Sequence, residues 1–139
     1  MALIQMGLVD LIAAIQTLVE EKTGLRCYDA VPQNAESPFY FAEAVGKRPD
    51  NSKTMFRDVF TVWIHVIAPP DEFGSSKAVY ELIQKLDEAF TEEITLPEDF
   101  WLIWQKNSGL QVIKTDETEE KHAVCSFEFC ISYGFKTKI

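Results

Sequence analysis

Histidine and cysteine are scarce in this sequence, which contains two histidines and three cysteines among 139 residues. His65 and His122 lie far apart in the chain, and neither has a second histidine at the spacing of metal ligands. A lone histidine in a strand pattern is more often a structural residue than a ligand, so we expect no metal site. The odd number of cysteines and the lack of a C-x-x-C pair argue against a disulfide framework and favour a reducing compartment.

Glycine is also scarce, and its six residues leave little material for a phosphate-binding loop. The sequence contains no Walker A motif, no G-x-G-x-x-G, no G-x-S-x-G and no H-E-x-x-H. Cys125 and His122 could be considered as a thiol–imidazole pair, but their i, i+3 spacing places them on opposite faces of a strand. We therefore expect a protein that is not an enzyme and that binds no cofactor.

The sequence also lacks long apolar runs and an excess of positive charge. No run approaches the roughly 18–20 apolar residues of a membrane span, and the first residues contain no Lys or Arg that would indicate a secretory signal. The 13 Lys and Arg residues are outnumbered by 22 Asp and Glu residues, which gives a formal net charge of −9. A chain that grips nucleic acid needs several cationic contacts to phosphates, so we expect neither specific nucleic-acid binding nor a membrane partner.

The sequence does contain enough apolar material for a core. Hydrophobic residues make up 47% of the chain and charged residues 25%, which is ordinary for a globular domain. A chain of this length buries about two thirds of the surface that its unfolded form exposes. No linker or internal repeat divides the sequence, so residues 1–139 are predicted to form one domain.

Two segments have apolar residues at the three- and four-residue spacing that is typical of helices buried on one side. The first is Leu8–Thr23, followed by Gly24 as a left-handed cap. The second begins near Ser75 or Ser76, which are common residue types at the N-cap, and continues to Phe90.

The other apolar segments alternate like strands or are rich in aromatic residues. Residues 39–45 and Met55–Ala68 flank a turn-rich segment at residues 46–54, so they are predicted to pair as an antiparallel hairpin. Because the strands occur in runs, we predict an α+β fold with two amphipathic helices packed on one mainly antiparallel sheet of about four to five strands. The remaining predicted strands are residues 26–30, 100–105, 110–115 and 122–135, with turns at residues 107–109 and 116–121.

The two signs of charge are separated along the chain. Residues 46–57 carry four basic residues, whereas the second predicted helix and the loop after it are acidic. A basic hairpin tip and an acidic helix could pair between identical neighbours, and such heterologous contacts can close into a ring. The alternative is that both are solvated surfaces, because an exposed ion pair contributes only about 0–1 kcal/mol. The candidate interface residues are Lys47, Arg48, Lys53, Arg57, Glu81, Asp87 and Glu88.

Several short phrases follow one another in a familiar order. The N-terminal helix is followed by YDAVPQ at residues 28–33 and SPFY at residues 37–40. A strand at residues 60–66, a helix at residues 79–90 and a last strand at residues 127–133 complete the layout. In this order the sequence resembles the minor tail proteins of long-tailed bacteriophages, specifically the tail-completion or tail-to-head joining proteins, which are similar in fold to the tail terminators.

This resemblance implies a structural protein of a phage or prophage, without enzymatic activity, that assembles as a six-fold ring. The ring would stand at the junction of tail and head, in a virion assembled in the cytoplasm of the bacterial host. Its implied partners are further copies of the chain, the tail-tube protein and the head connector or stopper, with DNA passing through the ring. The hairpin loop at residues 46–54 would contact a neighbour or the tube.

Two other functions remain open from the sequence. A tail terminator, which stops polymerisation of the tail tube, has a similar fold to a joining protein. A small ligand-binding or enzymatic α+β domain would need a concave pocket, and Trp63, Trp101 and Trp104 could line one or pack in the core.

Overall fold

The computed structural model describes residues 2–136 and shows two helices and a five-stranded mixed sheet, most of it antiparallel, which confirms the predicted α+β class. The first predicted helix and the long strand Met55–Ala68 have the bounds expected from the sequence. In chain order the elements are α1 (Leu8–Thr23), β1 (Cys27–Tyr28), β2 (Phe39–Pro49), β3 (Met55–Ala68), α2 (Lys77–Ala89), β4 (Trp101–Thr115) and β5 (Lys121–Phe135).

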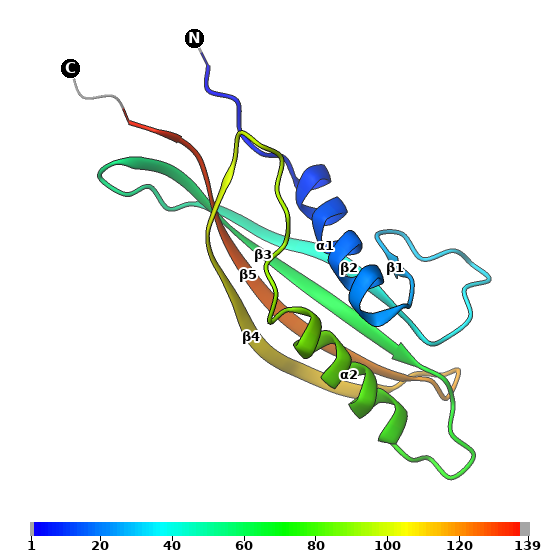
Figure 1. The fold of residues 1–139 in the computed structure, drawn as a ribbon. Coiled ribbons are helices and arrows are strands. Elements are labelled where there is room, and N and C mark those ends of the chain that lie inside the picture. Colours follow the sequence, from blue (N-terminus) through cyan, green and yellow to red (C-terminus); the bar gives the residue numbers. More distant parts are fainter. Residues whose placement is uncertain (1, 137–139) are drawn as a thin grey trace.

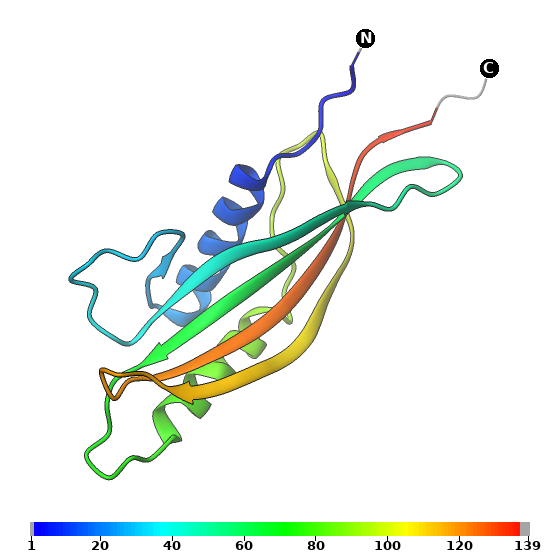
Figure 2. The same cartoon turned by 180° about the vertical axis from the view of Figure 1, so that it is seen from behind.

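The sheet has the strand order β1-β2-β3-β5-β4. Only the short β1 pairs in parallel, with β2, and the other neighbours are antiparallel. Both helices lie on the same face of the sheet (Figures 1 and 2). The opposite face, which we call the open face, is covered by no helix of the described residues 2–136.

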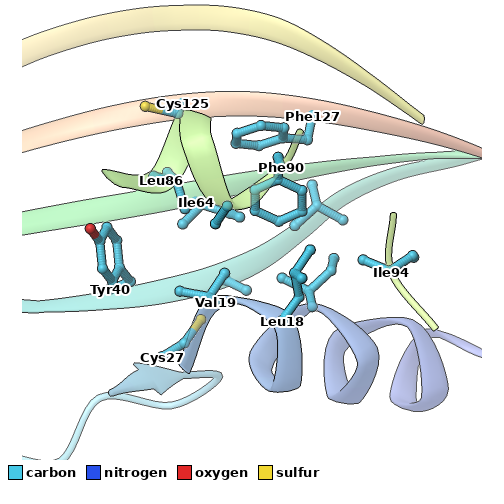
Figure 3. Packing of buried hydrophobic residues seen from close by; sticks show 14 of the residues in the cluster. Leu18, Val19, Cys27, Tyr40, Ile64, Leu86, Phe90, Ile94, Cys125 and Phe127 are labelled. Atoms are coloured by element: carbon cyan, nitrogen blue, oxygen red, sulfur yellow. The ribbon is translucent and has the colours of Figure 1, made fainter. Parts of the chain in front are cut away.

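The core lies between the helices and the sheet (Figure 3). α1 buries Leu11, Ile15, Leu18 and Val19 against it, and ends at Gly24, whose φ of 74° confirms the predicted left-handed cap. α2 contributes a second set of buried residues, Val79, Leu82, Leu86 and Ala89.

Two buried rings and one buried hydroxyl connect the layers of the core. Phe90, directly after α2, packs against Phe127 of β5 with ring centroids 4.3 Å apart. The Tyr40 hydroxyl donates a hydrogen bond of 2.7 Å to the carbonyl of Leu82. Because a buried hydroxyl without a partner costs free energy, this bond allows a fully buried tyrosine on β2 to pack beneath α2.

The hairpin turn predicted at residues 46–54 is shorter in the structure. β2 continues to Pro49, and only residues 50–54 form the turn. Gly46 and Pro49 suggested a turn by residue type, but Gly46 pairs with Thr61 after a register shift, and Pro49 pairs with Asp58 at the end of the strand. Glycine at a bulge and proline at a strand end are both compatible with pairing.

The two short strands predicted at residues 100–105 and 110–115 are one strand in the structure, β4. The turn predicted at residues 107–109 is a register shift within it. Gly109 takes a φ of 100°, and its N–H donates to the Asn107 side-chain oxygen at 2.8 Å. Residues 107–109 therefore do form a local turn-like contact. They form it as a bulge within β4, which stays paired with β5.

Candidate functional site

The hairpin formed by the distal ends of β2 and β3 projects beyond the rest of the fold (Figure 1). We call residues 46–57 the arm. Its tip is ordered by hydrogen bonds: the Asp50 N–H donates to the Arg57 carbonyl at 2.9 Å, and the Arg57 N–H donates to the Asn51 side-chain oxygen at 2.9 Å. The Ser52 N–H donates to the Met55 carbonyl at 3.0 Å. The arm is thus a structural element whose tip has a defined backbone conformation.

All four basic candidates lie on the arm, but they differ in their contacts. The Arg57 guanidinium lies 3.3 Å from the Asp50 carboxylate, and the Lys47 ammonium lies 3.9 Å from the nearly buried Asp58 carboxylate. Burial raises the pKa of Asp58, an effect that Lys47 opposes. Arg48 and Lys53 form no ion pair with any residue in the described part of the chain. These two cations are the ones free to meet an external anion.

The three acidic candidates lie on α2 and are exposed. Glu81 pairs with Lys77 at 3.8 Å. Asp87 accepts a hydrogen bond from Asn107 at 2.9 Å, and Glu88 accepts one from Gln84 at 3.1 Å.

The structure does not bring the arm and α2 together within one chain. Across residues 2–136, no ion pair connects the arm with α2, and the arm points away from the helices (Figures 1 and 2). Any direct pairing of the two sets would have to occur between copies. The polar contacts that Glu81, Asp87 and Glu88 already make reduce what such pairing would gain.

The three tryptophans lie toward the open face and are partly exposed. Trp63 pairs in register with Ser126, and Trp101 pairs with Ser132 further along β5. Six residues of strand separate these partners by about 20 Å. Trp63 and Trp101 therefore cannot line one small pocket, and the geometry gives no support to the ligand-binding alternative.

The two histidines, interpreted from the sequence as isolated residues, contact each other on the open face. His65 Nδ1 lies 2.8 Å from His122 Nε2, and His65 Nε2 lies 2.8 Å from the Glu43 carboxylate. His122 Nδ1 lies 3.3 Å from the Asp116 carboxylate. The Phe41 ring stacks on His65 with centroids 4.0 Å apart. The two histidines become neighbours only through the pairing of β3 with β5, which the sequence does not show. In that pairing Ile67, two residues after His65, lies opposite His122.

The surroundings of His122 are compatible with a neutral ring. Its Nδ1 faces the Asp116 carboxylate and its Nε2 faces His65 Nδ1, so a neutral His122 can donate its one N–H to Asp116 while Nε2 accepts from the neighbouring ring. Burial, which lowers the pKa of His122, agrees with a neutral ring there, as do the lowering effects of His65 and Lys114, whereas Asp116 opposes them.

This network predicts that acid weakens the fold. Because the pKa of His122 is lower in the folded state than its ordinary value of 6.5, the unfolded state binds the proton more tightly. The stability associated with a neutral His122 is fully present above about pH 6.5 and is lost as the pH falls below it, with a slope of at most about 1.4 kcal/mol per pH unit. Urea unfolding at pH values from about 7.5 to about 5, a range that brackets the ordinary histidine pKa, measures this slope.

The variant His122→Asn is the comparison for that measurement. It removes the titrating ring and keeps a polar side chain, so its free energy of unfolding should change less over the same pH range. Equal slopes in the two proteins would contradict the assignment of the acid sensitivity to His122.

The cysteines are all free and buried. Burial raises the pKa of the Cys27 and Cys125 thiols to about 12, and it also raises the pKa of Cys130. Cys125 belongs to the core, whereas His122 contacts His65 on the open face, so the two do not form a thiol–imidazole pair. A thiol with a raised pKa is a poor nucleophile, because the thiolate is the reactive form.

Within residues 2–136 no three His, Cys, Asp or Glu side chains are grouped so that they could hold a metal ion. No helix in the same range combines the length and the apolar character needed to cross a membrane.

Comparison with known proteins identifies a family and shows that the fold is similar to that of a virion protein chain. The family model described as "Putative tail termination protein" matches residues 2–139. A chain in the solved structure titled "Virion of native gene transfer agent (GTA) particle" has a similar fold, with a TM-score of 0.59 and 15% sequence identity. The similarity covers 89% of this chain and 96% of that one. No curated protein matches the sequence.

Proposed function

The chain belongs to the phage tail terminator family, and from this membership we propose that it binds the head-proximal end of the tail tube and stops its growth. The single observation that carries the proposal is the family match over residues 2–139. We place termination ahead of head joining, which the sequence phrases favoured, because termination is the activity that the family description states. The similarity of this fold to that of a chain in a gene transfer agent particle is compatible with a role as a virion protein.

We further propose that the protein acts as a ring of identical subunits, six by the resemblance, and without catalysis. The arm and the helix layer lie in different parts of the molecule, so a contact between them would be heterologous (Figure 1). Heterologous contacts close into a ring when the rotation per subunit permits. The proposed partners are the tail-tube protein below the ring and the head connector or stopper above it. The net charge of −9 would limit sticking of DNA that passes through.

Deletion of the gene from its source phage, followed by electron microscopy of the lysate, tests the proposal. Loss of a terminator should produce tails of uncontrolled length, and a plasmid copy of the gene should restore normal tails. Filled heads beside free tails of normal length would instead assign the joining role. Intact virions would contradict both roles.

A further inference from the structure

We propose that, in the ring on which the proposed function rests, the arm of one copy docks in a groove between α1 and residues 93–97 of the next copy. This groove was not among the sequence-predicted interface residues, which placed the acidic partner of the arm on α2. Four features support the groove: its shape, its unpaired carboxylates, the unpaired cations of the arm and the direction in which the arm points.

The groove has a volume of about 370 Å³ and an apolar floor. Ala14 and Leu18 of α1 and Leu96 and Pro97 of the facing segment contribute to it. Its wall is held in place, because Lys22 pairs with Glu92 at 2.6 Å. The Gln105 side chain also donates to the Glu92 carbonyl at 2.8 Å and accepts from the Ile94 N–H at 3.0 Å. The groove is therefore a preformed receptor surface rather than a gap in a loose loop.

Three exposed carboxylates line this groove: Asp10, Glu21 and Glu93. Across residues 2–136, none of the three forms an ion pair or a side-chain hydrogen bond. This distinguishes them from Glu81, Asp87 and Glu88 of α2, each of which contacts a lysine or an amide within its own chain. Unpaired negative charge beside an apolar floor is complementary to a cationic segment that also has apolar surface.

The arm supplies such a segment. Among the described residues, its Arg48 and Lys53 have no ionic partner, and exposed Pro49 lies between them. The aliphatic stems of Arg and Lys cover apolar surface while their charged ends reach carboxylates. From Gly46 to the end of β2 the arm extends about 10–13 Å before its turn, which is long enough to enter a shallow groove.

The arm cannot occupy the groove of its own chain. Figures 1 and 2 show the arm pointing away from the helix layer that contains α1. The arm and the groove are therefore separate, complementary surfaces on one molecule, which is the arrangement that a head-to-tail ring requires.

A pair of charge-reversal variants tests this docking. The variant R48E/K53E carries a reversed arm, and the variant E21K/E93K carries a reversed groove. Each alone should fail to associate, because its arm and groove then have the same sign. When mixed, a reversed arm meets a reversed groove and a native arm meets a native groove, so alternating assembly should be restored. Sedimentation at low ionic strength, where ionic contacts are least screened, measures association of each protein and of the equimolar mixture.

The matched control is E81K/E88K, the same charge reversal on α2, which should associate like the native chain. Circular dichroism and urea unfolding establish that each variant folds. A folded mixture that associates no more than its separate components overturns the docking, whatever the deletion phenotype. Association lost in E81K/E88K but kept in E21K/E93K would also overturn it and would place the acceptor on α2. Normal tail lengths after gene deletion would contradict termination without changing this result.

Discussion

Replacement of Phe127 by alanine should lower the free energy of unfolding by about 3–5 kcal/mol. Phe127 is fully buried in β5, a central strand, and its ring packs on Phe90 at 4.3 Å. The loss combines the transfer free energy of the ring with the cost of the cavity that remains. Because a domain has only about 5–15 kcal/mol of stability, the variant should approach the point at which the native state is no longer dominant. Urea unfolding followed by circular dichroism measures the change.

Phe73→Ala is the matched control for this prediction. Phe73 is 89% exposed in the loop before α2, so the same truncation there should change the free energy of unfolding by no more than about 0.5 kcal/mol. Similar losses in the two variants would mean that Phe127 does not occupy the core as the structure places it.

Shortening of the arm should abolish control of tail length while the fold is kept. Pro49 and Asp58 are opposite partners on β2 and β3, so residues 50–57 can be replaced by Asn-Gly, the preferred two-residue hairpin turn. None of the removed residues belongs to the core cluster, but Met55–Arg57 are partly buried residues of β3 that pair with β5, so urea unfolding must first establish that the variant keeps the fold. Lys53 and the tip that carries it are lost, so subunits should no longer dock. We expect tails as irregular as those of the gene deletion, as measured by electron microscopy after complementation.

The matched control shortens a different hairpin. Thr115 and Lys121 are opposite partners on β4 and β5, and replacement of residues 116–120 by Asn-Gly removes a shorter and more exposed turn. This variant should restore normal tails. Normal tails from the arm variant, or irregular tails from both variants despite intact folding, would contradict a specific role of the arm.

The parts of the fold that the sequence predicted well depend on local patterns. The apolar stripe of α1 and the cap residue Gly24 defined that helix, because both signals lie within a few residues. The extent of β2 and the continuity of β4 depended instead on the neighbouring strand. Gly46 and Gly109 have the residue type of a turn, but pairing with β3 and β5 holds them within strands. Such tertiary effects override local propensity and are not visible in one sequence.

The candidate site likewise has features that could be predicted from the sequence and features that could not. The four basic residues share one hairpin, so their clustering could be predicted from the sequence. Their division into paired and unpaired cations could not, because Asp58 faces Lys47 only once the register of β2 and β3 is known. The groove was missed because Glu21 and Glu93 are distant in the chain and line one groove only when residues 93–97 pack along α1. The contact between His65 and His122 was missed for the same reason.

Cryo-electron microscopy of purified tails, averaged over their head-proximal ends, tests the central claim most directly. The expected result is a closed ring of copies of this fold at that end, with residues 50–54 of each copy between α1 and residues 93–97 of the next. A tail end without this protein would contradict the proposed function. A ring in which the arms contact no neighbouring groove would contradict the docking alone.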